Sequence, residues 1–141
     1  MQAWTLRKET HMRFWLLIGA LNGALAVALG AVGAHALGPA TPDVTRSVFE
    51  TAAHYHLIHS LALIGVAAIA PHLPGISSRR IVHAAGAAFT TGIVFFCGGL
   101  YAFSGLDMSF GARLAPFGGT LLIVGWFMLA AAALANRSHK P

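Results

Sequence analysis

Charge is scarce in this sequence. Nine of its 141 residues are Lys or Arg and four are Asp or Glu, so 9% of the chain is charged, whereas 57% is hydrophobic. Ordinary soluble domains carry about 25% charged residues. The length indicates a single domain, and the shortage of charge argues against a water-soluble one.

Cysteine and catalytic motifs are sparse as well. The one cysteine, Cys97, lies inside an apolar stretch, which excludes an intrachain disulfide and a CxxC site. A buried free cysteine behaves as a small apolar residue. Gly30-Ala31-Val32-Gly33 has no preceding strand, so it is not a dinucleotide-binding turn. Since no Ser-His-Asp set follows from the spacing either, we predict no catalytic residue, no metal, no cofactor and no enzymatic activity.

The sequence does contain four long apolar stretches. They hold no Asp, Glu, Lys or Arg apart from Glu50, near the start of the second stretch. A helix needs about 20 mostly apolar residues to cross the hydrocarbon core of a bilayer. The stretches are residues 14–37, 49–70, 81–103 and 114–135. They predict an all-α integral membrane protein, an up-down bundle of four transmembrane helices.

The remainder of the chain divides around these stretches. We expect residues 1–12 to form a polar N-terminal tail, residues 13–136 the transmembrane domain, and residues 137–141 a basic C-terminal tail. Ala34-His35-Ala36 resembles the cleavage site of a signal peptide, but the apolar region of such a peptide is usually about 7–15 residues long. The first stretch is longer than that, so we expect it to be retained as a helix.

Basic residues lie at the ends of the apolar stretches rather than on one folded face, which argues against nucleic-acid binding. With four crossings, seven of the nine fall on one side of the bilayer, and Arg46 and Arg113 fall on the other. Basic residues accumulate on the cytoplasmic side. We therefore predict a bacterial cytoplasmic (inner) membrane protein with both termini cytoplasmic and the loops 38–48 and 104–113 outside. The seven are Arg7, Lys8, Arg13, Arg79, Arg80, Arg137 and Lys140.

Small residues recur three or four positions apart in the first stretch and cluster in the fourth. Such spacing lets helix backbones approach closely in lipid. We interpret it as helix packing, with a gap left for a ligand as the alternative. The glycines expected at helix contacts are Gly19, Gly23, Gly30, Gly33, Gly118 and Gly119.

Three single residues carry further expectations. Asn22 is the one amide inside an apolar stretch, so it should hydrogen-bond across a helix interface. Trp15 should anchor the first helix at the cytoplasmic interface, where Trp is enriched. Pro116 is expected in the first turn of the fourth helix.

A set of short motifs resembles a known family. The motifs are Phe14-Trp15-Leu16-Leu17, Gly30-Ala31-Val32-Gly33-Ala34-His35-Ala36-Leu37, Thr51-Ala52-Ala53-His54-Tyr55-His56, His59-Ser60-Leu61-Ala62-Leu63, Ala115-Pro116-Phe117-Gly118-Gly119 and Gly125-Trp126. Over residues 12–135 they resemble the YgdD-like family of small inner-membrane proteins, also called domain of unknown function 423. The resemblance implies a four-helix protein of the bacterial cytoplasmic membrane and brings no established reaction, substrate or cofactor. This chain departs from the family pattern by its extension before Met12 and by His56, where relatives often carry Gln.

Histidines gather in the outer halves of the first two stretches, at His35, His54, His56 and His59. An ionisable side chain inside a membrane is a functional hypothesis by default. One interpretation is structural, with His35 and His59 bonded to backbone carbonyls or to Tyr and Asn side chains between helices. A second is a proton or small-solute path lined by Glu50, His54, His56 and His59.

A metal or haem site built from His35, His56 and His59 is a third interpretation. At a rise of about 1.5 Å per residue, His35 lies roughly 3 Å inside the end of the first helix and His59 roughly 15 Å below the start of the second span. Ligands must lie about 2.0–2.1 Å from a shared ion, so the full set requires a helix shift of two turns.

These patterns predict a non-catalytic structural or accessory protein of the lipid bilayer, self-associating or joined to a larger membrane complex. A small-solute or proton-linked transporter or channel using the second-helix histidines is the alternative, and a metal- or haem-binding subunit is the third hypothesis. On the outer side we expect Arg113 to pair with Glu50, with an outward-facing polar vestibule as the alternative.

Overall fold

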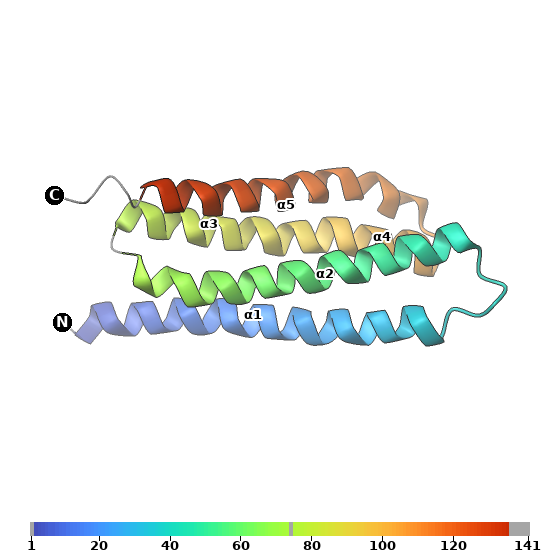
Figure 1. The fold of residues 1–141 in the computed structure, drawn as a ribbon, viewed down its shortest axis with the longest axis horizontal. Helices are drawn as coiled ribbons and strands as arrows, with labels where there is room; N and C mark the ends of the chain where they lie inside the picture. Colours follow the sequence, from blue (N-terminus) through green and yellow to red (C-terminus); the bar gives the residue numbers. More distant parts are fainter. Residues whose placement is uncertain (1, 74, 136–141) are drawn as a thin grey trace.

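The protein is a bundle of long helices joined by short connections in the computed structural model, which describes residues 2–73 and 75–135 (Figure 1). The first two crossings are α1 (Gln2–His35) and α2 (Asp43–Ile69), and α2 ends in the 3-10 turn η1 (Ala70–His72). The third crossing consists of α3 (Ile76–Gly92), the π-helical segment η2 (Ile93–Cys97) and α4 (Gly98–Leu106). The fourth is α5 (Ser109–Ala135).

Four helical segments are long and apolar enough to cross a membrane, as the sequence predicts. They are Thr10–His35, Asp43–His72, Ile76–Leu106 and Ser109–Ala135, with mean hydropathies between 1.4 and 2.0. The second and third extend beyond their apolar stretches at both ends and the fourth at its start, because the helices continue through the polar flanking residues; the first instead ends two residues short, at His35. The fold class is therefore confirmed as an all-α bundle of four membrane-spanning helices.

The two ends of the chain can be compared with the predicted N-terminal and C-terminal tails. The helical path of α1 begins at Gln2, so residues expected as a polar tail continue the first helix ahead of its candidate span. The predicted basic tail, 137–141, lies outside the described residues. The division into two tails and one domain stays a prediction.

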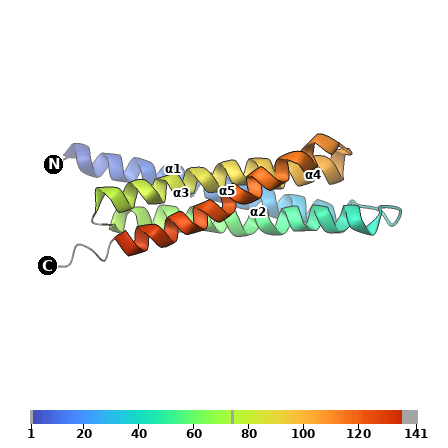
Figure 2. The same cartoon turned by 90° about the horizontal axis from the view of Figure 1, so that it is seen from above.

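The four crossings run antiparallel to their neighbours in the chain. Helix α1 begins, and α5 ends, at one end of the bundle, which we call the terminal end; the connections 36–42 and 107–108 lie at the other, which we call the hairpin end (Figure 1). The most extensive interfaces join α1 to α2 and α3 to α5, while α2 contacts all three parts of the third crossing. Figure 2, the view turned by 90°, shows α5 crossing obliquely over the helices beneath it.

The interior lies mainly between α2, the third crossing and α5. Its fully buried large side chains include Leu63 and Val66 on α2 and Val82 and Phe89 on α3. Cys97 is also fully buried, as expected for a cysteine that acts as a small apolar residue. Helix α1 is peripheral: 17% of its apolar window is buried, against 44% for the second and third spans. Most of α1 therefore faces lipid or a partner.

The π-helical segment lies against α5 at a close backbone contact. A Cβ atom on Gly118 would overlap the backbone of Phe96 in η2, so only glycine permits this contact. Two turns earlier in α5, Gly111 and Gly99 of α4 meet backbone to backbone. Pro116 is inside α5 rather than in its first turn, because the helix starts at Ser109, before the apolar stretch. That part of the prediction was wrong.

Candidate functional site

A hydrogen-bonded cluster in the bundle interior joins α1, α2 and α4. Asn22 Nδ2 donates to the carbonyl oxygen of Ile18 at 2.8 Å, which leaves its Oδ1 free to accept. That oxygen lies 3.0 Å from Nε2 of His56 on α2. The structure thus confirms that Asn22 bonds across a helix interface.

The partners of His56 define its protonation pattern. An amide oxygen only accepts hydrogen bonds, so the His56 Nε2 facing Asn22 carries the proton. The unprotonated Nδ1 faces the hydroxyl of Tyr101 on α4 at 3.5 Å, a long hydrogen bond in which Tyr101 donates. His56 is buried, and in this arrangement it is a neutral imidazole with both nitrogens occupied.

His59, three residues further along α2, has the opposite tautomer. Its Nδ1 lies 2.7 Å from the carbonyl oxygen of Tyr55, so Nδ1 carries the proton. Its Nε2 accepts a hydrogen bond of 3.2 Å from the indole Nε1 of Trp126 on α5. The ring also packs on Phe89, with ring centroids 5.7 Å apart. His59 therefore ties α2 to α5 and α3, in agreement with the structural interpretation.

A further polar contact, not foreseen from the sequence, lies at the terminal end. The Trp15 indole donates from Nε1 to Nδ1 of His83 on α3 at 2.8 Å. Trp15 is 7% exposed, and its ring fills the space in front of Gly86, where a Cβ atom would approach it to 2.8 Å. The prediction of Trp15 as an interfacial anchor was wrong, because the missing side chain of Gly86 admits the indole between helices.

Two expected interactions do not form. His35 is exposed at the end of α1 and makes no hydrogen bond within the described residues. No ion pair joins Glu50 to Arg113 in the described part of the chain, where both side chains are exposed. The nearby Arg46 instead donates from Nη2 to the carbonyl oxygens of Leu37 and Gly38, in the connection that follows α1.

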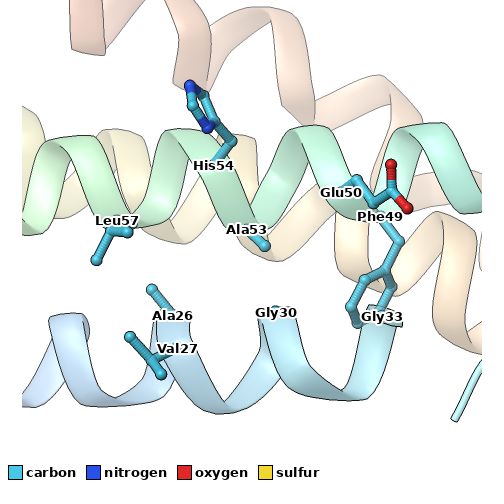
Figure 3. A pocket seen from close by; sticks show the side chains of 9 residues that line it. All are labelled: Ala26, Val27, Gly30, Gly33, Phe49, Glu50, Ala53, His54 and Leu57. Atoms are coloured by element: carbon cyan, nitrogen blue, oxygen red, sulfur yellow. The ribbon is translucent and has the colours of Figure 1, made fainter. Parts of the chain in front are cut away.

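Glu50 and His54 belong to a groove between α1 and α2 that faces away from the interior. The groove encloses about 270 Å³, and Figure 3 shows its lining. Apolar residues form its walls, and Glu50 and His54 stand on the α2 rim with their side chains directed away from α1. The lining residues are Ala26, Val27, Gly30, Gly33, Phe49, Glu50, Ala53, His54 and Leu57. The groove thus includes two predicted site residues, whereas His56 and His59 are buried away from it.

The predicted packing glycines fall into two groups. Gly19, Gly33 and Gly118 lie so close to a neighbouring helix that an added Cβ would overlap Ile64, Phe49 or the Phe96 backbone. At Gly23, Gly30 and Gly119 the nearest atoms would stand 3.8, 4.0 and 3.4 Å from such a Cβ, so a methyl group meets little or no overlap. Gly30 instead provides part of the groove floor.

The geometry limits what the buried histidines can do chemically. A metal ligand must offer a ring lone pair, and the lone pairs of His56 Nδ1 and His59 Nε2 face the donors Tyr101 and Trp126. Within residues 2–73 and 75–135, no group of three or more His, Cys, Asp or Glu side chains has metal-binding geometry. His35, His56 and His59 are not brought together.

Tyr101 and Trp126 are the partners that the sequence did not identify individually. Their amphipathic character was the one feature of the sequence that could have indicated this role, because the polar atom of a Tyr or Trp usually finds a hydrogen-bond partner when buried. Pairing each with a particular histidine requires the helix register across 45 and 67 residues of sequence, which composition does not supply.

Comparison with known proteins places this architecture in a family. The family model described as "Protein of unknown function (DUF423)" matches residues 29–119. The UPF0382 membrane protein YwdK of Bacillus subtilis is 41% identical over 87% of this chain and 98% of its own length. A UPF0382 membrane protein of Haemophilus influenzae is 30% identical over 88% of this chain and 96% of its own. No solved structure matches the chain significantly.

Proposed function

We propose, for a chain that belongs to the DUF423 family, a non-catalytic role as a structural or accessory protein of its membrane. It is a small membrane protein with four candidate spans, and its relatives are named only as membrane proteins. One observation carries the finer proposal: within the described residues, every buried side-chain nitrogen or oxygen already has a hydrogen-bond partner.

This observation distinguishes a structural interior from a binding site. A site that holds a solute or metal keeps a donor or acceptor available for it. Here Asn22, His56 and Tyr101 satisfy one another, and His59 satisfies Trp126. Such interhelical bonds contribute about 0.6–2 kcal/mol each in membranes, so the cluster's effect is to fix the helix register.

The accessory part of the proposal rests on the peripheral α1. Ala20, Ala24 and Ala28 recur four residues apart on its exposed side, and small residues at that spacing permit close helix association in lipid. We propose that this face contacts a second copy or a larger membrane complex. The seven-to-two distribution of basic residues supports a cytoplasmic-membrane location with both termini cytoplasmic.

Disulfide crosslinking in native membranes tests the association. Ala24→Cys should give a crosslinked dimer or a crosslink to a partner, whereas Phe127→Cys, on the exposed side of α5, should give neither. The unmodified protein is the blank, because Cys97 is fully buried. Monomer alone from both variants would contradict the proposed association.

The transporter alternative makes a different prediction. If the second helix carried a proton or solute, His59→Ala and Glu50→Gln would both abolish a flux and leave membrane abundance unchanged. We expect His59→Ala to lower abundance, because it removes the bond to Trp126, and Glu50→Gln to leave abundance unchanged, because Glu50 has no partner among the described residues.

A further inference from the structure

The position of Glu50 in the bilayer requires an explanation that the rest of the protein does not provide. The second span has 30 residues, about 45 Å of helix against about 30 Å of hydrocarbon, so roughly 7 Å projects at each end if the span is centred. Glu50 is seven residues after Asp43, about 10 Å along the helix. Its carboxyl group therefore lies just inside the hydrocarbon boundary at the hairpin end.

A carboxyl group at this depth is costly unless it finds a partner. The described part of the chain offers none: Arg113 does not reach Glu50, and Arg46, one turn before it, is bonded to carbonyl oxygens in the connection after α1. The counter-charge is then supplied by what surrounds the helix, and the nearest charged groups of the lipid are the head groups at this boundary.

The groove shows a gradient of polarity along its length. From the hairpin end toward the bilayer centre, the α2 rim presents the Glu50 carboxylate, then the His54 imidazole one turn deeper, then Leu57 (Figure 3). Across from Leu57, Val27 on α1 is 62% exposed. Gly30 leaves the floor between the helices hollow, whereas the ring of Phe49 fills the space in front of Gly33.

We propose that this groove binds a bilayer phospholipid with a primary ammonium head group, in the leaflet at the hairpin end. The order of groups in such a lipid matches the order in the groove. The ammonium donates hydrogen bonds to the Glu50 carboxylate, and the imidazole of His54 donates to a phosphate or ester oxygen. One acyl chain lies between Val27 and Leu57, over Gly30.

Charge selects the head group among bilayer lipids. A purely anionic head group would place like charge beside Glu50, and a quaternary ammonium has no N–H to donate to the carboxylate. A primary ammonium satisfies both requirements, since it is cationic and carries three donors. The proposal does not require the protein to self-associate.

Native mass spectrometry of the protein from nanodiscs tests the proposal directly. Discs containing equal parts of phosphatidylethanolamine and phosphatidylglycerol should release protein that retains the ethanolamine lipid, enriched about tenfold over the glycerol lipid, as expected for one charge-assisted contact. Glu50→Gln should abolish the enrichment. Asp43→Asn, which removes a carboxylate outside the groove, should retain it.

A second pair of variants tests the apolar part of the groove. Gly30→Leu places its Cβ in open contact, 4.0 Å from Ala53, and its remaining carbons in the hollow, so it should reduce the retained lipid. Gly65→Leu makes the same change outside the groove, where no atom lies within 4 Å of the new Cβ. It should leave the amount of retained lipid unchanged.

Several results would overturn the proposal. They are equal retention of the two lipids, enrichment of the anionic one, enrichment unchanged in Glu50→Gln, or a lipid-free dimer in which a second copy fills the groove. If Glu50→Gln fails to accumulate, the wild-type protein in phosphatidylcholine discs decides the matter. In discs that contain equal parts of phosphatidylcholine and phosphatidylglycerol, the wild-type protein should show no enrichment of the choline lipid over the glycerol lipid, because the methylated amine cannot donate.

Discussion

Two imidazoles in the interior of this bundle have opposite tautomers because their partners differ. His56 donates from Nε2 to an amide oxygen, and His59 donates from Nδ1 to a backbone carbonyl. Each second nitrogen accepts from an aromatic side chain on another helix. Side chains with both polar atoms engaged in this way hold helices together rather than bind a solute.

Substitution of His56 tests whether its hydrogen bonds alone are needed or whether the imidazole ring itself is needed. Gln carries one amide donor for Asn22 and one carbonyl acceptor for Tyr101, so His56→Gln should unfold at nearly the wild-type temperature. His56→Leu leaves the Asn22 oxygen without a donor, which should cost about 1 kcal/mol. Thermal unfolding in detergent micelles, together with membrane abundance, measures both. Equal destabilisation by Gln and Leu would mean that the imidazole itself is needed.

The contacts of a single residue could be predicted from the sequence where a polar side chain lies within an apolar stretch and must therefore find a hydrogen-bond partner. Asn22 stands alone in an apolar stretch, so its need for a partner follows from the sequence. The contact between Trp15 and His83 does not, because it depends on the space in front of Gly86 and on the register of α1 against α3. The expected pair of Glu50 and Arg113 failed for the same reason, since charge suggests a partner but not its distance.

At the scale of elements, the third crossing departs from a regular α-helix where α5 touches it. The π-helical residues Ile93–Cys97 include Phe96, whose backbone lies against Gly118. π-helical turns inside α-helices are rare, and this one coincides with a close approach of two helix backbones. The contact depends on the absence of a side chain on Gly118.

Gly118→Ala should therefore destabilise the bundle, because the added methyl group overlaps backbone atoms that have no rotamer to adopt. We expect a loss of about 1–3 kcal/mol, typical of overpacking. Gly65→Ala is the matched control, since it lies in α2 with nothing within 4 Å of an added Cβ. Thermal unfolding of the two variants in the same detergent measures the difference, and a Gly118→Ala protein as stable as the control would refute the close contact.

The number and type of helices followed from the sequence, whereas their ends did not. Apolar length predicts a crossing, but helices extend into the head-group region, where Asp43, Ser109 and other polar residues remain helical. The π-helical segment carries no local signal, since it arises from contact with another helix. The groove was not predictable either, because it depends on the space left beside Gly30 between α1 and α2.

At the scale of the whole molecule, four crossings place residues 40 and 77 on opposite sides of the membrane. Ala40 and Ser77 are both exposed, so single cysteines there are suitable labelling sites. With an impermeant maleimide on intact cells, Ala40→Cys should be labelled, and Ser77→Cys should be labelled only after permeabilisation. The reverse pattern would place the termini outside, against the distribution of basic residues. Labelling of both on intact cells would contradict four crossings.

The packing of the whole molecule also explains why the polar side chains of the interior find their hydrogen-bond partners within the bundle. Two helical pairs, α1 with α2 and α3 with α5, meet through α2, and the polar cluster lies at that junction. His56 links α2 to α1 and α4, and His59 links it to α5. The junction thus carries the polar contacts, whereas the outer faces meet lipid and present the groove.

The state of these two imidazoles in the folded protein tests this account most directly. Nitrogen-15 NMR of histidine-labelled protein in micelles distinguishes the two neutral tautomers from each other and from the imidazolium ion. At neutral pH we predict protonation at Nε2 alone for His56 and at Nδ1 alone for His59, unchanged when divalent metal is added. Doubly protonated rings, exchanged tautomers, or resonances shifted by stoichiometric metal would contradict a purely structural interior.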